Sequence, residues 1–281
     1  MVKTKYSPTS AYRTLSVSRS NALTQLKWVE YGHSQNKVRK SMSYIIYQQQ
    51  QDIAYAMFDK LVALSHSTQD CVHIALSGGT TPKSVFELIN QLGQSTAINW
   101  QKLHFWWCDE RCVDFADKES NFGEADRLLF ASVDIPRENL HPMQGDISPE
   151  QAALNYVREL KKHVPQINGV PQFDWVWLGM GDDGHTASLF VNGVPLSSDK
   201  WVEVAVHPST KQTRITLTLK VLNNAKMIDF LVTGENKAAM LAKVFDRESV
   251  TIDYPAKAVD LTTGRLVWHV DQAAASELDE G

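Results

Sequence analysis

Short apolar segments alternate with amphipathic helical patterns through most of this sequence. The segment after Pro82, for example, has Val85, Leu88, Ile89 and Leu92 at positions i, i+3, i+4 and i+7, which is the spacing of one helix face. Strands separated by helices form βαβ units, in which the strands are parallel and helices cover both faces of the sheet. The sequence therefore predicts an α/β fold, a doubly wound and mostly parallel sheet with helices on both faces.

The expected elements follow one another from residue 43 onward. We expect strands over 43–47, 71–76, 103–108, 173–179, 201–206, 214–219, 227–233 and 265–270. We expect helices over about 49–65, from Pro82, and over about 121–131, 149–163 and 235–246. Ligands in such sheets bind beyond the carboxyl ends of the strands. Functional residues are therefore expected in the loops that directly follow strands.

Length and composition limit the class of protein. With 281 residues, of which 43% are hydrophobic, the chain can bury a full core as one large or two small domains. No stretch approaches the roughly 18 apolar residues of a membrane span, so we expect a soluble protein without membrane contact. The cysteines are too few for a disulfide framework and indicate a reducing compartment, so we expect a cytoplasmic protein.

Charge is distributed unevenly along the chain. Residues 1–40 hold eight Lys or Arg and one acid, which leaves 20 basic and 31 acidic residues in 41–281. A domain this acidic is unsuited to nucleic acid, whose binding depends on neutralised phosphates. We predict a basic, poorly ordered extension over 1–40, an α/β domain over 41–272 and an acidic tail over 273–281. The Ser-rich, acid-poor start leaves organelle targeting open.

The loop after the strand at 71–76 has the chemistry of a phosphate cradle. Its glycines let backbone N–H groups face a ligand, its hydroxyls add donors, and the following helix N-terminus favours an anion. A tight strand-to-helix turn is the structural alternative. The residues concerned are Ser77, Gly78, Gly79, Thr80 and Thr81.

Three charged residues directly follow the strand at 103–108, where side chains project either into a site or into solvent. They are Asp109, Glu110 and Arg111. A metal site could be drawn from His104, Cys108 and Cys112. On a strand, however, the first two lie about 13 Å apart, so no metal is expected there.

The segment DWVWLGMGDDGHTASLF (174–190) contains G-x-G-x-x-G, the pattern of a dinucleotide-binding loop. Asp182 and Asp183 would face the pyrophosphate, where like charge is costly. Glu203, at the spacing of the ribose-binding acid, lies inside the next apolar segment rather than at its end. We therefore expect no dinucleotide cofactor.

His185, at the exit of this glycine turn, is the candidate general base. An unperturbed histidine has a pKa near 6.5 and is mostly neutral at pH 7. A neighbouring carboxylate can fix its tautomer, and the short helical pattern after it would hold its pKa down. A purely structural histidine is the alternative.

Two further cations complete the candidate set. Arg214 shares one face of its strand with Thr216 and Thr218, opposite the apolar face. Lys237 falls in the first turn of a helix, where the dipole disfavours a cation. A bound anion would explain that position; an ordinary surface lysine is the alternative.

These four segments, in this order, resemble the 6-phosphogluconolactonase family over about 43–270. The matching stretches are 76–82, 109–111 with 120–121, 178–190, 214–218 and 233–238. Asp114 and Val191 stand where the family usually or often has proline. The resemblance implies a modified Rossmann fold, like that of glucosamine-6-phosphate deaminase. It also implies hydrolysis of 6-phospho-D-glucono-1,5-lactone to 6-phospho-D-gluconate, in the pentose phosphate pathway, without metal or cofactor.

The residues and the resemblance together suggest roles. His185 is expected to take a proton from water, with Asp183 orienting it and Arg111 facing the developing oxyanion. Asp109 is expected to shape the pocket or bind a sugar hydroxyl. The residues expected to hold the phosphate are Ser77, Gly78, Gly79, Thr80, Thr81, Arg214 and Lys237.

Two other functions stay open at this point. A glucosamine-6-phosphate deaminase would typically have Tyr in place of Arg111 and a Glu shortly after the histidine, whereas the next acid here is Asp199. The other is a sugar-phosphate-sensing domain of a transcription regulator. Such a protein would need an attached DNA-binding helix-turn-helix, and residues 1–40 show no clear three-helix pattern. The expected partners are the small lactone and, transiently, glucose-6-phosphate dehydrogenase.

Overall fold

The protein is described by a computed structural model that covers residues 25–31, 40–91, 97–246, 254–261 and 263–278. The predictions for residues 1–24, 32–39 and 279–281 lie outside the described residues. Within the described part, no helix is both long and apolar enough to cross a membrane.

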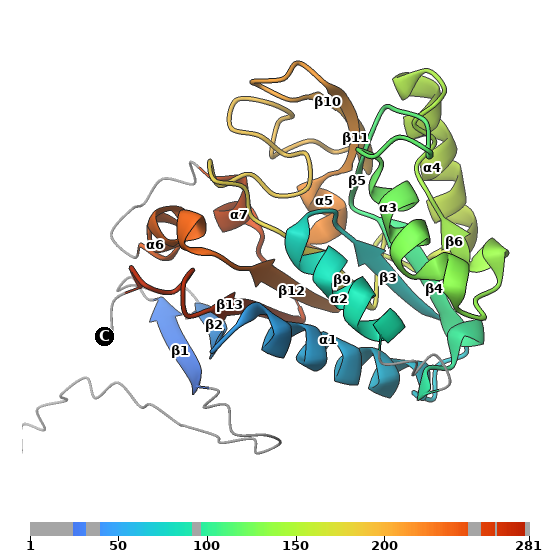
Figure 1. The fold of residues 1–281 in the computed structure, drawn as a ribbon. Helices are drawn as coiled ribbons and strands as arrows, with labels where there is room; N and C mark the ends of the chain where they lie inside the picture. The colour runs from blue at the N-terminus through green and yellow to red at the C-terminus, as the bar shows by residue number, and fades with distance from the viewer. Residues whose placement is uncertain (1–24, 32–39, 92–96, 247–253, 262, 279–281) are drawn as a thin grey trace, which may run out of the picture.

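The central sheet has the predicted doubly wound, mostly parallel organisation (Figure 1). Its first strand pairs antiparallel to the second, and the remaining pairs are parallel. In spatial order the strands are β1 (Gln25–Tyr31), β2 (Lys40–Tyr47), β13 (Arg265–Asp271), β12 (Met227–Val232), β9 (Trp175–Leu178), β3 (Val72–Leu76), β4 (Leu103–Trp107) and β6 (Leu140–His141).

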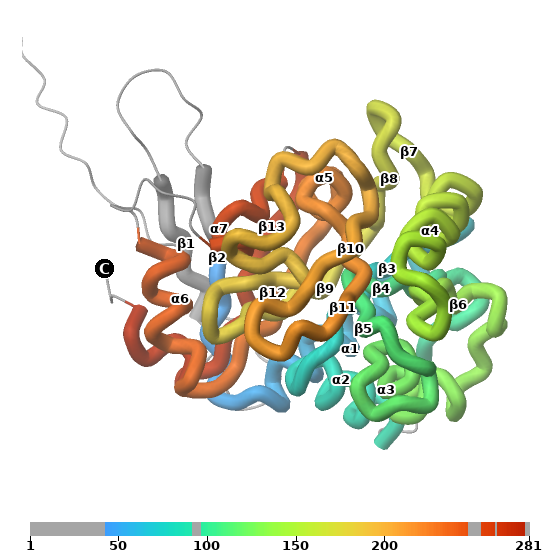
Figure 2. Tube along the Cα trace, turned by 90° about the horizontal axis from the view of Figure 1, so that it is seen from above, coloured from blue at the N-terminus to red at the C-terminus, as the bar shows by residue number. Residues whose placement is uncertain are grey.

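Helices cover both faces of this sheet, as expected for βαβ units (Figure 2). Buried residues of α1 (Gln50–Ser65), α2 (Thr80–Gln91) and α3 (Asn121–Leu128) pack into one core. A second core holds residues of α4 (Pro149–His163), α5 (Leu219–Leu222), α6 (Ala238–Phe245) and α7 (Pro255–Ala258). Side chains of β3 point alternately to the two faces of the sheet, so that Ile74 and Leu76 pack in the first core and Ala75 packs in the second.

Two predicted strands do not belong to the central sheet. β10 (Val202–Val206) and β11 (Thr213–Leu217) form an antiparallel sheet with β5 (Asp109–Arg111), which we had interpreted as a loop. No helix separates β10 from β11, so the chain turns back in a hairpin and the pair is antiparallel. A further short hairpin joins β7 (Gln166–Ile167) to β8 (Val170–Pro171).

Described residues on both sides of the predicted domain limits make regular contacts with the domain. Residues 25–31, assigned to a poorly ordered extension, form β1 and pair with β2 along seven positions. Past residue 272, Ala274 is buried in the core and its N–H donates to Asp271 Oδ1 at 2.8 Å. The start of the predicted acidic tail is therefore part of the packed domain.

A buried charge network ties α1 to the sheet. Asp229 of β12 is 1% exposed; its Oδ2 lies 2.5 Å from Lys60 Nζ and accepts from Trp175 Nε1 at 2.9 Å. His269 Nε2 lies 3.4 Å from Oδ1, and Tyr47 contacts the other nitrogen of that ring at 2.8 Å. Burial favours the neutral carboxyl, but His269 and Lys60 outweigh it and hold the pKa of Asp229 well below its usual value.

We predict that Asp229→Ala lowers the free energy of unfolding by about 3–5 kcal/mol, because it removes a buried carboxylate and leaves the partly buried Lys60 and the Trp175 N–H without their partner. Denaturant unfolding at neutral pH measures this. Since the fold favours the ionised carboxylate, its contribution is present above the ordinary pKa of 3.8 and is lost as the pH falls below it. Asp59→Ala, at an exposed position of α1 next to Lys60, is the control. Equal effects of the two substitutions would contradict the network.

Candidate active site

A cavity of about 270 Å³ lies where β3, β9 and β12 end, beside the small sheet. It brings together residues from all four segments singled out in the sequence. Of the predicted site residues, those that line it are Ser77, Gly78, Gly79, Thr80, Thr81, Asp109, Arg111, His185, Arg214 and Lys237. Asp183 is not among the lining residues, but it contacts His185.

The loop after β3 is held against two neighbouring segments. Thr81 Oγ1 lies 2.9 Å from Thr233 Oγ1, in the loop after β12. A Cβ at Gly78 would lie 1.9 Å from Asn121 Oδ1, so only glycine allows this approach to α3. The helix begins at Thr80, which makes Pro82 its third residue rather than its first. Its N-terminus opens on the cavity and favours an anion there.

Glu110 anchors the strand that carries the charged residues. Its fully buried carboxylate accepts from the backbone N–H groups of Asn121 at 2.7 Å and Phe122 at 2.8 Å, at the start of α3. Burial raises the pKa of Glu110 to about 7, although these hydrogen bonds favour the carboxylate. Glu110 therefore joins β5 to α3 instead of facing the cavity.

Asp109 and Asn121 form one wall of the cavity. Ser188 Oγ donates to Asp109 Oδ2 at 2.7 Å, and Asn121 Nδ2 donates to the Asp109 carbonyl at 2.9 Å. Asn121 belongs to the stretch that carries the family resemblance, but the sequence analysis gave it no role. Its amide lies at the cavity wall because Glu110 holds the start of α3 beside β5.

Two guanidinium groups share another wall. Arg111 and Arg214 are direct partners in the β5–β11 ladder. Burial, and then the charge of Arg111, lowers the pKa of Arg214. Arg111 Nε is buried without a hydrogen-bond partner among the described residues. Two neighbouring cations repel each other, so this wall favours a bound anion.

His185 is held in one tautomer by Asp183. The Nδ1–Oδ1 distance is 2.5 Å, and the same oxygen accepts from the His185 backbone N–H at 3.1 Å. A carboxylate only accepts, so Nδ1 carries the proton and Nε2 keeps its lone pair. Burial raises the pKa of Asp183, but the charge and hydrogen bonds of His185 outweigh it and lower that pKa. A Cβ at Gly181 would lie 2.1 Å from Nδ1, so this position needs glycine.

One expectation about this region is wrong, and the position of Lys237 has a further explanation. No helix follows His185; residues 186–189 form a turn closed by a bridge between Thr186 and Leu189, so the helix N-terminus expected directly after the imidazole is absent from this segment. The ammonium of Lys237 also has a protein partner, because it pairs with Asp182. An unseen anion is therefore not needed to explain the position of this lysine, although its side chain lines the cavity.

His207 is a neighbour that the sequence analysis did not identify. Its ring centroid lies 6.4 Å from that of His185, with Phe190 packed against both rings. Its Nδ1 accepts from the backbone N–H groups of Ser209 and Thr210, each at 3.2 Å. It lies in the hairpin between β10 and β11, and only the tertiary fold brings it close to His185.

Comparison with known proteins gives the family. The model described as glucosamine-6-phosphate isomerases/6-phosphogluconolactonase matches residues 48–268. The chain belongs to this family. A 6-phosphogluconolactonase of Haemophilus influenzae is 42% identical over 203 residues, which cover 72% of this chain and 86% of that protein. A 6-phosphogluconolactonase of Aggregatibacter actinomycetemcomitans is 38% identical over 237 residues, or 84% of this chain and 100% of that protein.

The fold agrees with the same family. The crystal structure of devB protein superposes with a TM-score of 0.82 at 38% identity, over 84% of this chain and 99% of that one. The two departures from the family pattern lie outside the cavity lining: Asp114 accepts from the Ala116 N–H at 2.7 Å, and Val191 is exposed.

We predict opposite tautomers for the two neighbouring histidines in their neutral forms. Asp183 holds the proton of His185 on Nδ1, whereas two backbone donors hold the proton of His207 on Nε2. Long-range ¹⁵N–¹H NMR correlations distinguish the two forms. In Asp183→Ala the His185 signals are expected to shift toward a tautomer mixture while those of His207 stay unchanged. Finding His185 protonated on Nε2 in the wild type would contradict the geometry.

Proposed function

We propose that this chain is a 6-phosphogluconolactonase, which hydrolyses 6-phospho-D-glucono-1,5-lactone to 6-phospho-D-gluconate. The observation that carries the proposal is a histidine fixed by a carboxylate at the wall of a cavity that also holds a glycine-rich anion cradle and two arginines. The family and relatives that are 38% and 42% identical support the same reaction.

In the proposed mechanism His185 acts as a general base. Its Nε2 takes a proton from water as the water oxygen bonds to C1 of the lactone, and the imidazolium is stabilised by Asp183. The C1–O bond of the ring then breaks, and His185 returns the proton to the departing ring oxygen. Arg111 stabilises the oxyanion that forms in between. A lactone is already electrophilic, so proton transfer worth about 10²–10⁴ in rate is the main chemical task.

The phosphate is proposed to bind against the glycine-rich loop after β3. Backbone N–H groups of residues 78–81, the hydroxyls of Ser77, Thr80 and Thr81, and the cations of Arg214 and Lys237 are the groups that would hold it. Asp109 would accept from a sugar hydroxyl or keep Ser188 and Asn121 in place. Binding of the phosphate thus orients C1 of the lactone, which lies several bonds away, for attack by water.

The acid groups around the cavity favour hydrolysis over deamination. Proton transfers to and from carbon call for further carboxylates near the histidine, in addition to Asp109 of the cavity lining and the Asp183 that fixes the ring. Asp199, the next acid in sequence, is almost fully exposed and pairs with Lys220 away from the cavity lining. Glu110 is hydrogen-bonded to the start of α3.

Transient contact with glucose-6-phosphate dehydrogenase, which would supply the lactone, is part of the same proposal.

We predict that His185→Ala lowers kcat about 10²–10⁴-fold while the fold stays intact. Asp183→Asn is expected to lower it as well, because the amide no longer fixes the productive tautomer. The lactone is generated by glucose-6-phosphate dehydrogenase, and its disappearance is followed against the spontaneous rate. His66→Ala, which removes a surface histidine elsewhere, is the control. Near-wild-type kcat in His185→Ala would refute the mechanism.

We predict that Lys237→Ala mainly raises KM, by about 10-fold or more, because it removes a cation that binds substrate and transition state alike. Steady-state kinetics in the same assay separate KM from kcat. Lys220→Ala is the matched control, since that lysine also pairs with an aspartate but lies outside the cavity. A large fall in kcat at unchanged KM would place Lys237 at the reacting centre instead.

A further inference from the structure

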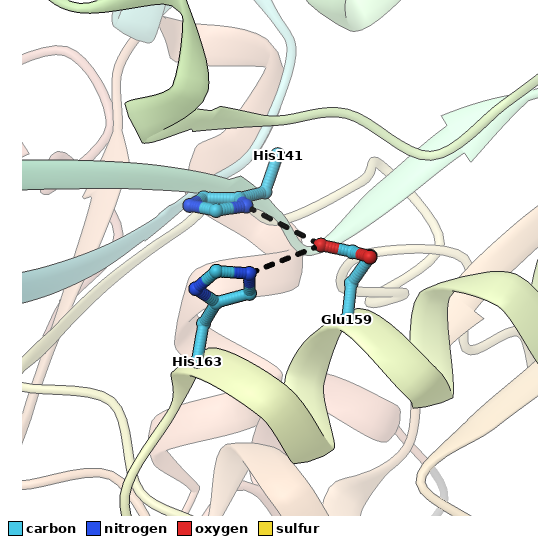
Figure 3. Close-up of side chains that lie close together, drawn as sticks. All are labelled: His141, Glu159 and His163. Atoms are coloured by element: carbon cyan, nitrogen blue, oxygen red, sulfur yellow. Dashed lines mark ion pairs between the residues drawn. The ribbon is translucent and has the colours of Figure 1, made fainter.

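A second group of ligand-type side chains lies at the β6 edge of the central sheet, apart from the cavity lining. His141 of β6 faces Glu159 and His163 of α4 (Figure 3). Glu159 Oε2 lies 3.4 Å from His163 Nε2 and 3.9 Å from His141 Nδ1. The candidate ligand atoms of the three residues lie within 4.8 Å of one another. The proposed lactone hydrolysis uses none of these groups.

Two rigid elements hold this group together. Glu159 and His163 are four residues apart on α4, a spacing that puts both on one face of the helix. The neighbouring Tyr156 and Leu160 are buried in the core, which fixes how α4 lies on the sheet. The third residue comes from a strand of that sheet. Sites built on such elements keep their geometry better than sites on loops.

The ring of His141 is oriented from two sides. It stacks on Trp106 with 3.9 Å between centroids and an angle of 7°. Its Nε2 lies 3.0 Å from His104 Nδ1, which leaves Nδ1 directed at Glu159. The 3.9 Å from Nδ1 to that carboxylate is too long for a hydrogen bond. Histidine ligands of metals characteristically engage their second ring nitrogen in a hydrogen bond of this kind.

The exposure of the group also suits a cation. Glu159 is about half exposed and His163 about one-third exposed. An ion can therefore enter from solvent, and water can complete its coordination.

We propose that His141, Glu159 and His163 form a binding site for a divalent transition-metal ion of the Zn²⁺ class. Two imidazoles and one carboxylate are a donor set that Zn²⁺ takes, with a further position open to water. Bonds of about 2.0–2.2 Å put tetrahedral ligand atoms about 3.3–3.5 Å apart. The His163–Glu159 pair already has this separation, and the His141–Glu159 pair is about 0.5 Å longer. The two imidazoles, whose ligand atoms lie within 4.8 Å of each other, need to approach by up to about 1.4 Å, which the partly exposed His163 allows.

Such an ion would cross-link α4 to the edge of the sheet. Because it binds the folded chain, it stabilises the fold by mass action. At about 100 times its Kd it raises Tm by about 5 °C in a domain of this size. The effect belongs to the α4–β6 contact and does not require the His185 pair.

The test is Zn²⁺ titration of the full chain after chelator treatment, by isothermal calorimetry, with Tm measured with and without the metal. We expect one equivalent to bind. His163→Asn and Glu159→Gln are expected to weaken binding at least about 100-fold and to abolish the rise in Tm. His104→Asn is expected to weaken it about 10-fold, as loss of an outer partner does. Lactone hydrolysis without added metal should be unchanged in His163→Asn.

Two controls locate the ion. His185→Asn removes the histidine–carboxylate pair of the candidate active site, and it should keep wild-type affinity for Zn²⁺. Co²⁺ bound in place of Zn²⁺ should show the visible absorption of a tetrahedral ion, and His163→Asn should lose it. The proposal is wrong if the wild type binds no Zn²⁺, if His163→Asn binds as tightly as the wild type, or if His185→Asn abolishes binding. These outcomes are independent of whether the lactone is the substrate.

Discussion

Parallel pairing of β3, β9 and β12 is the constraint from which the candidate site follows. Because neighbouring strands run the same way, the loops after all three open at one edge of the sheet. The glycine-rich cradle, the His185 turn and the segment with Lys237 are therefore close in space although they are far apart in sequence. The small antiparallel sheet then adds Arg111 and Arg214 from the side.

Residues that do not touch the ligand position those that do. Buried Glu110 fixes β5 to the start of α3, and this places Asp109 and Asn121 on the cavity wall. Glycine at 181 leaves the space in which the His185–Asp183 pair forms. These are steric and hydrogen-bonding constraints on the protein alone. The cavity is consequently organised before a substrate arrives, which limits the ordering that binding requires.

Local patterns predicted the elements that have strong periodicity and clear ends. The helix at 149–163 agrees residue for residue with α4, because Ser148 caps it, Pro149 begins it and its apolar face is regular. Ten of the residues that line the cavity were also predictable, since each follows a strand or belongs to a segment with an unusual charge or glycine pattern.

Long-range partners were not predictable from such patterns. The pairing of β5 with β11 joins residues about a hundred positions apart, and no local signal distinguishes a short strand there from a loop. The Asp182 partner of Lys237 and the meeting of His141 with α4 likewise depend on the tertiary fold. The same holds for Glu110, whose three-charge segment suggested a site but whose burial makes it a support for α3.

The most direct test of the proposed chemistry is a crystal structure with the product, 6-phosphogluconate, bound. We expect the phosphate to lie against residues 78–81 and Arg214. We expect the C1 carboxylate to lie within about 2.6–3.2 Å of His185 Nε2, directly or through one water. A product bound in the reverse direction, with its phosphate at His185, would contradict the assignment of general base and phosphate site together.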